Sequence, residues 1–396
     1  MSYNIGLSGL RSTNQALDVI SQNIANVSTA GFKAARAEYA ALYAGGEAGG
    51  VEIAQVSQDF SKDGSKEFTG RNLDMAISGQ GFFVTKNAMG QMAYTRAGTF
   101  NKDANNFIVS ASGDKLQGYS VDANGALATG VVTDLKVSAS NLPAKASTSV
   151  AFKANMRADA AVPTNPTFDP TDANSFNYSY TSRVYDSLGT EHTVTQYFVK
   201  DSANNWTSHY YMDGAAMGTP ATQALSFNTD GTLAAPATPV TLTMAPAGAD
   251  PMTVTMDYTG TTQYAADFSA SYDADGYSSG ELAGVRVDDD GSLYAVFTNG
   301  KDLLQGQVVL ANFANPNGLD KGDSTSWTST FASGNATLGN PGTGGMGSLT
   351  AGAYEGSNVD LTGELVNLMT AQRNYQANAK SISTADKMTQ VLFSSW

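Results

Sequence analysis

The chain has 396 residues, and 36 aspartates and glutamates outnumber 22 lysines and arginines, which gives a formal net charge of −14. This balance argues against a nucleic-acid or anionic-membrane binder, because both need a basic face. The sequence has no cysteine and two histidines, which excludes disulfides, thiolate catalysis and cysteine–zinc sites and argues against a histidine-rich metal centre. Charged residues make up 15% of the chain against about 25% in typical domains, so we expect a polar, weakly charged surface that tolerates packing against copies of itself.

The first residues carry neither a basic stretch nor an apolar run, so they do not resemble a cleavable secretory signal peptide. No stretch approaches the about 20 apolar residues that span a bilayer, and we expect no direct membrane insertion.

From Gly6 to about Val27 the apolar residues recur with helical spacing. They lie seven, three, four and three residues apart, which is the a/d pattern of a coiled-coil seam: Leu10, Leu17, Ile20, Ile24 and Val27. Gly31 is a suitable residue for the left-handed cap after such a helix. The sequence therefore predicts an N-terminal helix with one narrow apolar face.

The C-terminal residues repeat this pattern after a possible N-cap at Asn358 or Asp360. Spacings of four and three alternate through Leu361, Leu365, Leu368, Gln372, Tyr375, Ala379, Ile382, Asp386, Thr389 and Phe393. We expect the two helices to pack on each other as one coiled-coil domain formed by residues 1–30 and 358–396.

Neither seam is rich in large apolar residues, so an isolated helix pair would be marginal. Two interpretations stay open. The pair only closes the chain, or it orders by packing against neighbouring subunits. In the second case the polymer contact consists of Leu10, Leu17, Ile20, Ile24, Val27, Leu361, Leu365, Leu368, Tyr375 and Ile382.

Two glycine-rich segments lie inside the helices. The first contains Gly45, Gly46, Gly49 and Gly50, and the second, within residues 339–352, contains Gly342, Gly344, Gly345 and Gly347. They predict flexible connectors within residues 31–70 and 331–357, where the coil meets the body. The second segment matches GxGxxG but lacks the strand before it and the helix after it that a dinucleotide site needs, and no cofactor is expected.

The body is predicted to be antiparallel β. Residues 252–258 alternate apolar and polar side chains, and hairpins are predicted over 182–199 and 285–297, each with a glycine in its turn. Nine of the eleven prolines lie between Pro143 and Pro251, which indicates an inserted domain. The expected fold is mainly β with helical termini, and it has two stacked antiparallel β domains: an inner one (71–145 and 271–330) and an outer one (146–270) inserted into it.

Candidate chemistry is sparse. The acidic turns at 273–281 and 288–291 lack the ligand spacing of a calcium-binding EF-hand loop and are explained as β-turns. His192 and His209 sit in no motif with a nucleophile, and there is no GxSxG. The sequence predicts no catalytic, cofactor or metal residues, and the chain is not expected to be an enzyme.

Four blocks carry a family resemblance. Residues 21–33 (SQNIANVSTAGFK), 72–83, 94–100 and 364–380 (ELVNLMTAQRNYQANAK) are similar to signatures of the bacterial flagellar rod and hook proteins, in the expected order. Segments 184–189 and 311–319 resemble the hook members, whereas rod members are shorter and lack a large β insertion.

The resemblance implies a structural subunit of the flagellar hook, which polymerises into a curved flexible tube that transmits motor torque as a universal joint. It implies export by the flagellar apparatus to an extracellular position, and contacts with copies of itself, the distal rod, the hook cap and the hook–filament junction proteins. The alternatives are a distal rod subunit, a secreted β-rich adhesin or binding module, and an enzyme acting on polysaccharide.

Overall fold

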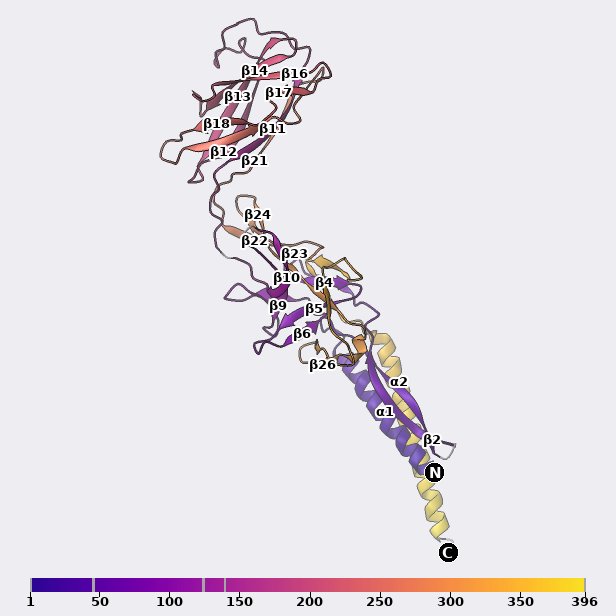
Figure 1. The fold of residues 1–396 in the computed structure, drawn as a ribbon. Helices are drawn as coiled ribbons and strands as arrows, with labels where there is room; N and C mark the ends of the chain where they lie inside the picture. Colours follow the sequence, from indigo (N-terminus) through magenta and orange to yellow (C-terminus); the bar gives the residue numbers. More distant parts are fainter. Residues whose placement is uncertain (1, 45–46, 123–124, 139, 395–396) are drawn as a thin grey trace. The chain divides into compact units, whose positions relative to one another are not determined.

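The computed structural model describes residues 2–44, 47–122, 125–138 and 140–394. These residues are mainly β, with a long helix near each end of the chain (Figure 1), which confirms the predicted fold class. The chain divides into two compact units. Unit 1 comprises Met1–Ala139, Gly284–Val296 and Asp302–Trp396, and unit 2 comprises Ser140–Ala283 and Phe297–Lys301.

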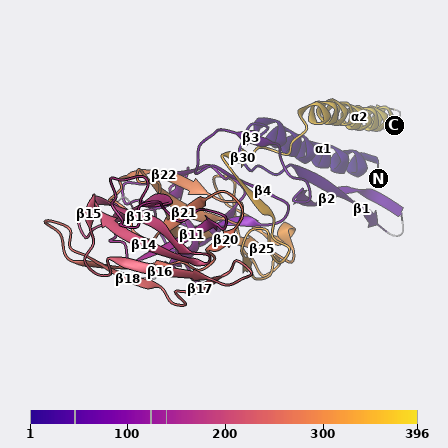
Figure 2. The same cartoon turned by 90° about the horizontal axis from the view of Figure 1, so that it is seen from above.

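The two long helices of unit 1 pack against each other in antiparallel directions (Figures 1 and 2). They are α1 (Ser2–Ala25) and α2 (Leu361–Ser394). Gly6 lies against Ile382, and near the other end of α1 the Asn23 amide donates to Glu364 Oε1 at 3.0 Å. Asp360, one of the two predicted caps, begins α2 by accepting a hydrogen bond from the Thr362 N–H at 3.1 Å.

A long β-hairpin follows α1 and packs along it (Figure 1). Strands β1 (Ala35–Ala44) and β2 (Glu47–Gln58) pair antiparallel along their whole length, and the Val51 N–H donates to Ser8 Oγ at 3.2 Å. Much of the predicted connector segment 31–70 is therefore regular β-structure, and the flexibility expected of its glycines stays a prediction. Gly49 and Gly50 belong to β2, and Gly50 packs against Ser8; Gly45 and Gly46 lie outside the described residues.

The body of unit 1 is a branched 13-stranded sheet among the described residues. Its central path runs β22-β23-β24-β9-β5-β6-β27-β26. Phe82, Tyr94, Phe313 and Trp327 fill one part of its core with edge-to-face ring contacts. The sheet strands are β5 (Phe82–Lys86), β6 (Met92–Thr95), β7 (Phe100–Lys102), β8 (Ile108–Ser110), β9 (Lys115–Val121), β10 (Leu127–Asp134), β22 (Leu282–Val287), β23 (Ser292–Phe297), β24 (Asp302–Val308), β25 (Leu310–Asn312), β26 (Asp320–Lys321), β27 (Ser326–Thr328) and β28 (Thr337–Gly339).

Two small two-stranded pairs link the body of unit 1 to the start of α2. Strand β29 (Ser348–Ala351) pairs with β4 (Met75–Ser78), and β30 (Ala353–Glu355) pairs with β3 (Lys66–Phe68). The second glycine-rich segment lies partly in these pairs. Gly342, Gly344 and Gly345 form open turns, whereas Gly347 packs against the carbonyl groups of Ser78 and Gln80. A one-turn 3₁₀ helix covers Pro316–Gly318.

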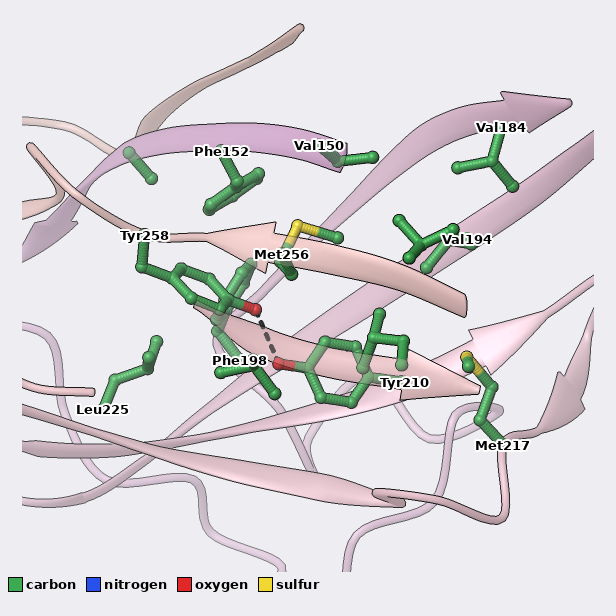
Figure 3. Close-up of a cluster of buried hydrophobic side chains, with 14 of the residues drawn as sticks. Val150, Phe152, Val184, Val194, Phe198, Tyr210, Met217, Leu225, Met256 and Tyr258 are labelled. Atoms are coloured by element: carbon green, nitrogen blue, oxygen red, sulfur yellow. Dashed lines mark hydrogen bonds between the residues drawn. The ribbon is translucent and has the colours of Figure 1, made fainter. Parts of the chain in front are cut away.

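Unit 2 is a two-sheet sandwich around its own apolar core. One sheet runs β18-β19-β11-β20 with β21 beside β11, and the other runs β12-β13-β14-β16-β17 with β15 beside β14. Core residues from both sheets meet, including Phe152, Phe198 and Met256, and the Tyr210 and Tyr258 hydroxyls are hydrogen bonded at 2.7 Å (Figure 3). The strands are β11 (Ser149–Arg157), β12 (Tyr178–Tyr185), β13 (Glu191–Ser202), β14 (Asn205–Met212), β15 (Ala215–Ala216), β16 (Thr222–Phe227), β17 (Leu233–Ala235), β18 (Val240–Met244), β19 (Met252–Asp257), β20 (Thr262–Tyr264) and β21 (Ser269–Ala274).

The predicted strand at 252–258 and both predicted hairpins are confirmed, as β19, β12–β13 and β22–β23. Two details differ from the sequence analysis. Strand β11 pairs in parallel with β19 and β20, so its sheet is mixed rather than purely antiparallel. Strand β21 pairs with β11, which places residues 271–283 with the inserted unit rather than with the inner domain.

Candidate assembly interface

Helix α2 presents a row of large apolar side chains that its own chain leaves uncovered. Between residues 361 and 391 only Ala371 is buried. Exposed apolar side chains follow the whole helix, namely Leu361, Leu365, Val366, Met369, Tyr375, Met388 and Val391. Most of them lie in the first half of the helix, and exposed apolar side chains that gather in this way are typical of a protein–protein contact rather than of a free surface.

Helix α1 buries a different stripe from the predicted seam. Its buried positions are small or polar: Gly6, Gly9, Ser12, Thr13, Ala16, Val19 and Asn23. Small side chains let neighbouring elements approach closely; a Cβ on Gly6 would lie 2.8 Å from Ile382 Cγ1, and one on Gly9 the same distance from Asn378 Nδ2. The predicted seam residues Leu10, Leu17, Ile20, Ile24 and Val27 are only half-buried.

The C-terminal seam is divided between two surroundings. Leu368 and Ile382 are half-buried, Ile382 against Gly6 of α1, whereas Leu361, Leu365 and Tyr375 are exposed. The structure thus brings part of the predicted seam into the helix pair and leaves the rest on the surface of the single subunit.

A buried charge cluster joins the helices to the body of unit 1. Glu355 accepts from Lys33 Nζ at 2.7 Å and from Arg96 Nη1 at 3.1 Å, and all three side chains are buried. Burial lowers the pKa of Lys33 and Arg96 lowers it further, whereas Glu355 opposes the shift. Because removing one partner of a buried ion pair typically costs about 3–5 kcal/mol, Glu355 is a strong determinant of this junction.

Two buried asparagines complete the junction. Asn23 pairs its side-chain amide with both backbone groups of Ala35 at 2.7 and 2.8 Å. Asn358 accepts from the Ala34 N–H at 2.7 Å and donates to the carbonyls of Asp59 and Lys62, both at 2.9 Å. These bonds hold the base of the hairpin against both helices.

The sequence analysis did not assign a role to Lys33, Arg96, Glu355 or Asn23, and it considered Asn358 only as a cap. The sequence offered one signal for these residues, namely their position relative to the four resemblance blocks. Lys33 ends the first resemblance block, and Arg96 lies inside the third block, whereas Glu355 lies outside all four.

A groove of about 1090 Å³ lies within unit 1 beside this junction. Ala16 and Ile20 of α1, β1, and residues 364–374 of α2 form its walls, while Phe60, Phe82 and the loop around Pro316 complete it. Glu364 lines the groove, and its Oε2 atom is buried without a hydrogen-bond partner.

The two histidines lie in unit 2. His192 places Nδ1 2.7 Å from Asp213 Oδ2 and Nε2 3.3 Å from Asp186 Oδ2, and His209 stacks on Phe168 with 3.9 Å between ring centroids. In the part of the chain that the structure describes, no group of three or more acidic, histidine or cysteine side chains has the arrangement of a metal site. None of the described helices is long and apolar enough to cross a membrane.

Exposed apolar side chains on α2 beside the buried Lys33–Glu355–Arg96 cluster are typical of a structural subunit that packs against other protein molecules. Four family models match this chain in order. They are the flagella basal body rod protein (4–33), the flagellar hook protein FlgE/F/G D1 domain (76–155), the flagellar basal body protein FlaE D2 domain (153–277) and the flagellar basal body rod FlgEFG protein C-terminal region (350–394).

Relatives match over nearly the full length. The chain is 38% identical over 407 residues to the flagellar hook protein FlgE of Salmonella typhimurium, which covers 99% of both proteins, and 38% identical over 402 residues to that of Escherichia coli, again with 99% of both covered. The FlgE of Rhizobium meliloti is 33% identical over 408 residues, covering 98% of this chain and 97% of that protein. The chain therefore belongs to the flagellar hook protein FlgE family.

A solved structure agrees at the level of the fold. The crystal structure of Helicobacter pylori flagellar hook protein FlgE2 aligns with a TM-score of 0.53 at 14% identity, over 73% of this chain and 98% of that one.

Proposed function

We propose that this chain is the structural subunit of the bacterial flagellar hook and that it polymerises into a curved, flexible tube that transmits torque from rod to filament. The observation that carries the proposal is the apolar face of α2, with Leu365, Met369 and Tyr375 exposed in the single subunit. Family membership supports further copies of the chain as the partner. The action of the protein is then mechanical, and no catalytic step is needed.

Further partners and the location of the protein follow from the same proposal. A hook subunit contacts the distal rod, the hook cap and the hook–filament junction proteins, and the flagellar export apparatus delivers it outside the cell. The half-buried seam residues of α1, Leu10, Leu17 and Ile24, are proposed to join α2 in the contact between subunits.

The test compares two matched pairs of substitutions in the purified full-length protein. Leu365→Ser with Met369→Ser removes two exposed apolar side chains from α2, and Leu188→Ser with Met89→Ser removes one leucine and one methionine that are at least as exposed but lie outside the helices. Polymer is measured by sedimentation and electron microscopy under polymerising salt, and the fold of the subunit by thermal unfolding.

We expect the helix pair of substitutions to abolish tubes while the main melting transition stays within a few degrees, because both side chains are exposed in the single subunit and neither belongs to its buried core. The control pair should polymerise with normal yield. Tubes of normal yield from the Leu365→Ser/Met369→Ser variant would show that this face is not the polymer contact.

A further inference from the structure

Methionine side chains carry all the sulfur of this chain, which has 13 methionines and no cysteine. In the part of the chain that the structure describes, most methionines are buried or half-buried. Four are exposed: Met89, Met92, Met369 and Met388. An oxidant in solution reaches exposed sulfur first, so these four are the positions at which the folded subunit can be oxidised.

Met369 has large apolar neighbours on its face of α2. Its side chain is 52% exposed. Leu365 and Val366 lie four and three residues before it, so they share its face of the helix, and both are exposed as well. Met369 therefore belongs to the group of exposed apolar side chains that the proposed function assigns to the contact between subunits.

The other three exposed methionines have different surroundings. Met388 lies on the same helix and is 66% exposed, but the residues four and three positions before it are Thr384 and Ala385. Met89 lies between β5 and β6, and Met92 begins β6, so both belong to the body of unit 1. Met388 is thus a natural control for Met369, because it has similar exposure on the same helix without the apolar group.

The chemistry is the transfer of one oxygen atom from a peroxide to the thioether sulfur. The O–O bond of hydrogen peroxide breaks, an S–O bond forms and water leaves, so the sulfur loses two electrons and the peroxide gains them. The product is methionine sulfoxide, which is polar where the thioether was apolar.

A sulfoxide at residue 369 opposes the contact between subunits. Water satisfies its oxygen on the free subunit, and burying that oxygen without a partner costs free energy. Arg373 lies one turn after Met369 and is exposed, so it offers the oxygen a donor. A contact that covered both groups would have to remove water from the guanidinium as well, which is again unfavourable.

We propose that Met369 is an oxidation-sensitive site that controls assembly. Hydrogen peroxide converts it to the sulfoxide in the free subunit and blocks polymerisation, whereas the contact in an assembled tube covers the sulfur and protects it. The inference rests on the proposed function, because it needs the exposed face of α2 to be the contact between copies of the chain.

The test compares the purified full-length natural chain with Met369→Leu and with the matched control Met388→Leu. Leucine keeps an apolar side chain of similar size and cannot accept oxygen. Each protein is treated with hydrogen peroxide as the free subunit, and the peroxide is then removed. Mass spectrometry of peptides measures sulfoxide at each methionine, and sedimentation under polymerising salt measures the lowest protein concentration that gives tubes.

We expect oxidation to raise this concentration at least tenfold for the natural chain and for Met388→Leu, and less than twofold for Met369→Leu. Methionine sulfoxide reductases return the sulfoxide to the thioether and should restore assembly of the oxidised natural chain. In preformed tubes, residue 369 should gain sulfoxide at least tenfold more slowly than in free subunits.

Normal assembly of the natural chain with residue 369 fully oxidised would overturn the proposal and leave the hook function intact. Equal losses in Met369→Leu and Met388→Leu would also overturn it, because another residue would then cause the effect. Failure of the untreated natural chain to form any tube would count against the hook function itself, and the inference would fall with it.

A second pair of variants tests the same site without an oxidant. Met369→Gln replaces the thioether by a polar amide of similar length and should raise the concentration needed for tubes at least tenfold. Met388→Gln should raise it less than twofold. Both side chains are exposed, so thermal unfolding of the subunit should change little in either variant. Equal effects on assembly would contradict a special role for Met369.

Discussion

The two histidines of unit 2 show how opposite surroundings act on the same side chain. Burial lowers the pKa of His192, but its contacts with the Asp213 and Asp186 carboxylates more than offset this, and the pKa is raised above its ordinary value. His209 is half-buried against Phe168, and burial lowers its pKa. The sequence analysis placed His192 in a predicted hairpin and gave neither histidine a catalytic role; the structure has His192 in β13 and His209 in β14.

We predict two separate imidazole titrations in the NMR spectrum of the folded protein, one above and one below the ordinary value of about 6.5. His209→Gln removes the lower one and so assigns both.

For His192 the folded pKa exceeds the unfolded one, so its contribution to stability is complete below the unfolded pKa and is lost as pH rises through the folded pKa. The melting temperature of unit 2 should therefore lose less on going from about pH 6 to 8 in His192→Gln than in the natural chain. Coincident titrations, or an unchanged pH dependence in His192→Gln, would contradict this.

The role of a buried charged residue such as Glu355 could not be predicted from the local sequence. Lys33 is 322 residues away from it in the chain, and neither residue belongs to a periodic pattern, so nothing in the local sequence connects them. The two residues meet because the segment that follows α1 and the segment that precedes α2 come together at one junction. Long-range polar contacts of this kind are not encoded in local periodicity, whereas helices and strands are.

At the scale of elements, the periodicity located both helices but not the face that each buries. The heptad pattern marked Leu10, Leu17 and Ile24, yet α1 packs through Gly6, Gly9 and Ala16. A hydrophobic pattern records every surface that must leave water, including surfaces covered only by other subunits. A difference between the predicted seam and the buried stripe is therefore expected of a subunit whose seam residues are covered only by other subunits.

The hairpin β1–β2 was missed because its sequence lacks strand signals. Ala35–Ala44 contains five alanines in ten residues and no regular alternation of large apolar side chains, and glycines near the turn resemble a linker. The strands are instead specified by α1 and by the Asn23 and Asn358 amides that hold their base. Propensity is a weak guide where tertiary contacts decide.

Gly31 and Gly342 provide a matched test of the junction. Both have left-handed φ angles, 67° and 73°, but a Cβ on Gly31 would overlap the backbone of Arg96 and Ala97, whereas one on Gly342 meets nothing within 4 Å. We expect Gly342→Ala to cost about 1–2 kcal/mol of unfolding free energy, the ordinary penalty of this conformation. Gly31→Ala should cost at least twice as much, because the backbone next to Arg96 must also move.

Urea unfolding of the two variants measures the difference, with Gly344→Ala as a second open-turn control. Equal losses for Gly31→Ala and Gly342→Ala would mean that the close approach at the end of α1 contributes nothing to stability.

At the scale of the whole molecule, unit 2 is an insertion with its own core. The two chain segments that enter and leave it are joined by isolated antiparallel bridges, with reciprocal hydrogen bonds between Leu142 and Gly280, at 2.8 and 3.0 Å, and between Lys145 and Tyr277, both at 3.0 Å. Its existence was predicted from the run of prolines and turn signals. Its C-terminal limit was placed too early, because pairing of β21 with the distant β11 has no local signature.

Excision of unit 2 tests which properties of the polymer depend on unit 2 and which depend on unit 1. Because Leu142 and Gly280 are already a bonded antiparallel pair, residues 143–279 can be replaced by Asn-Gly, which closes a two-residue hairpin. We expect this variant to fold and to polymerise, since α1, α2 and the charge cluster around Glu355 all belong to unit 1.

The resulting tube should be straight or variably bent rather than natively curved. Subunit contacts in a curved, rotating tube must shorten and lengthen, and small, wet, polar contacts can rearrange at less cost than close-packed apolar ones. Unit 2 offers such a surface, with Thr241, Thr243 and Thr253 exposed between buried residues of β18 and β19.

Electron microscopy of the tubes measures their curvature. Thr241→Lys with Thr253→Lys in the full-length chain should alter this curvature without loss of polymer, because the added charges repel across these contacts. Normally curved tubes from the excision variant would remove unit 2 from the determination of curvature, and a complete failure to polymerise would place essential assembly contacts in unit 2.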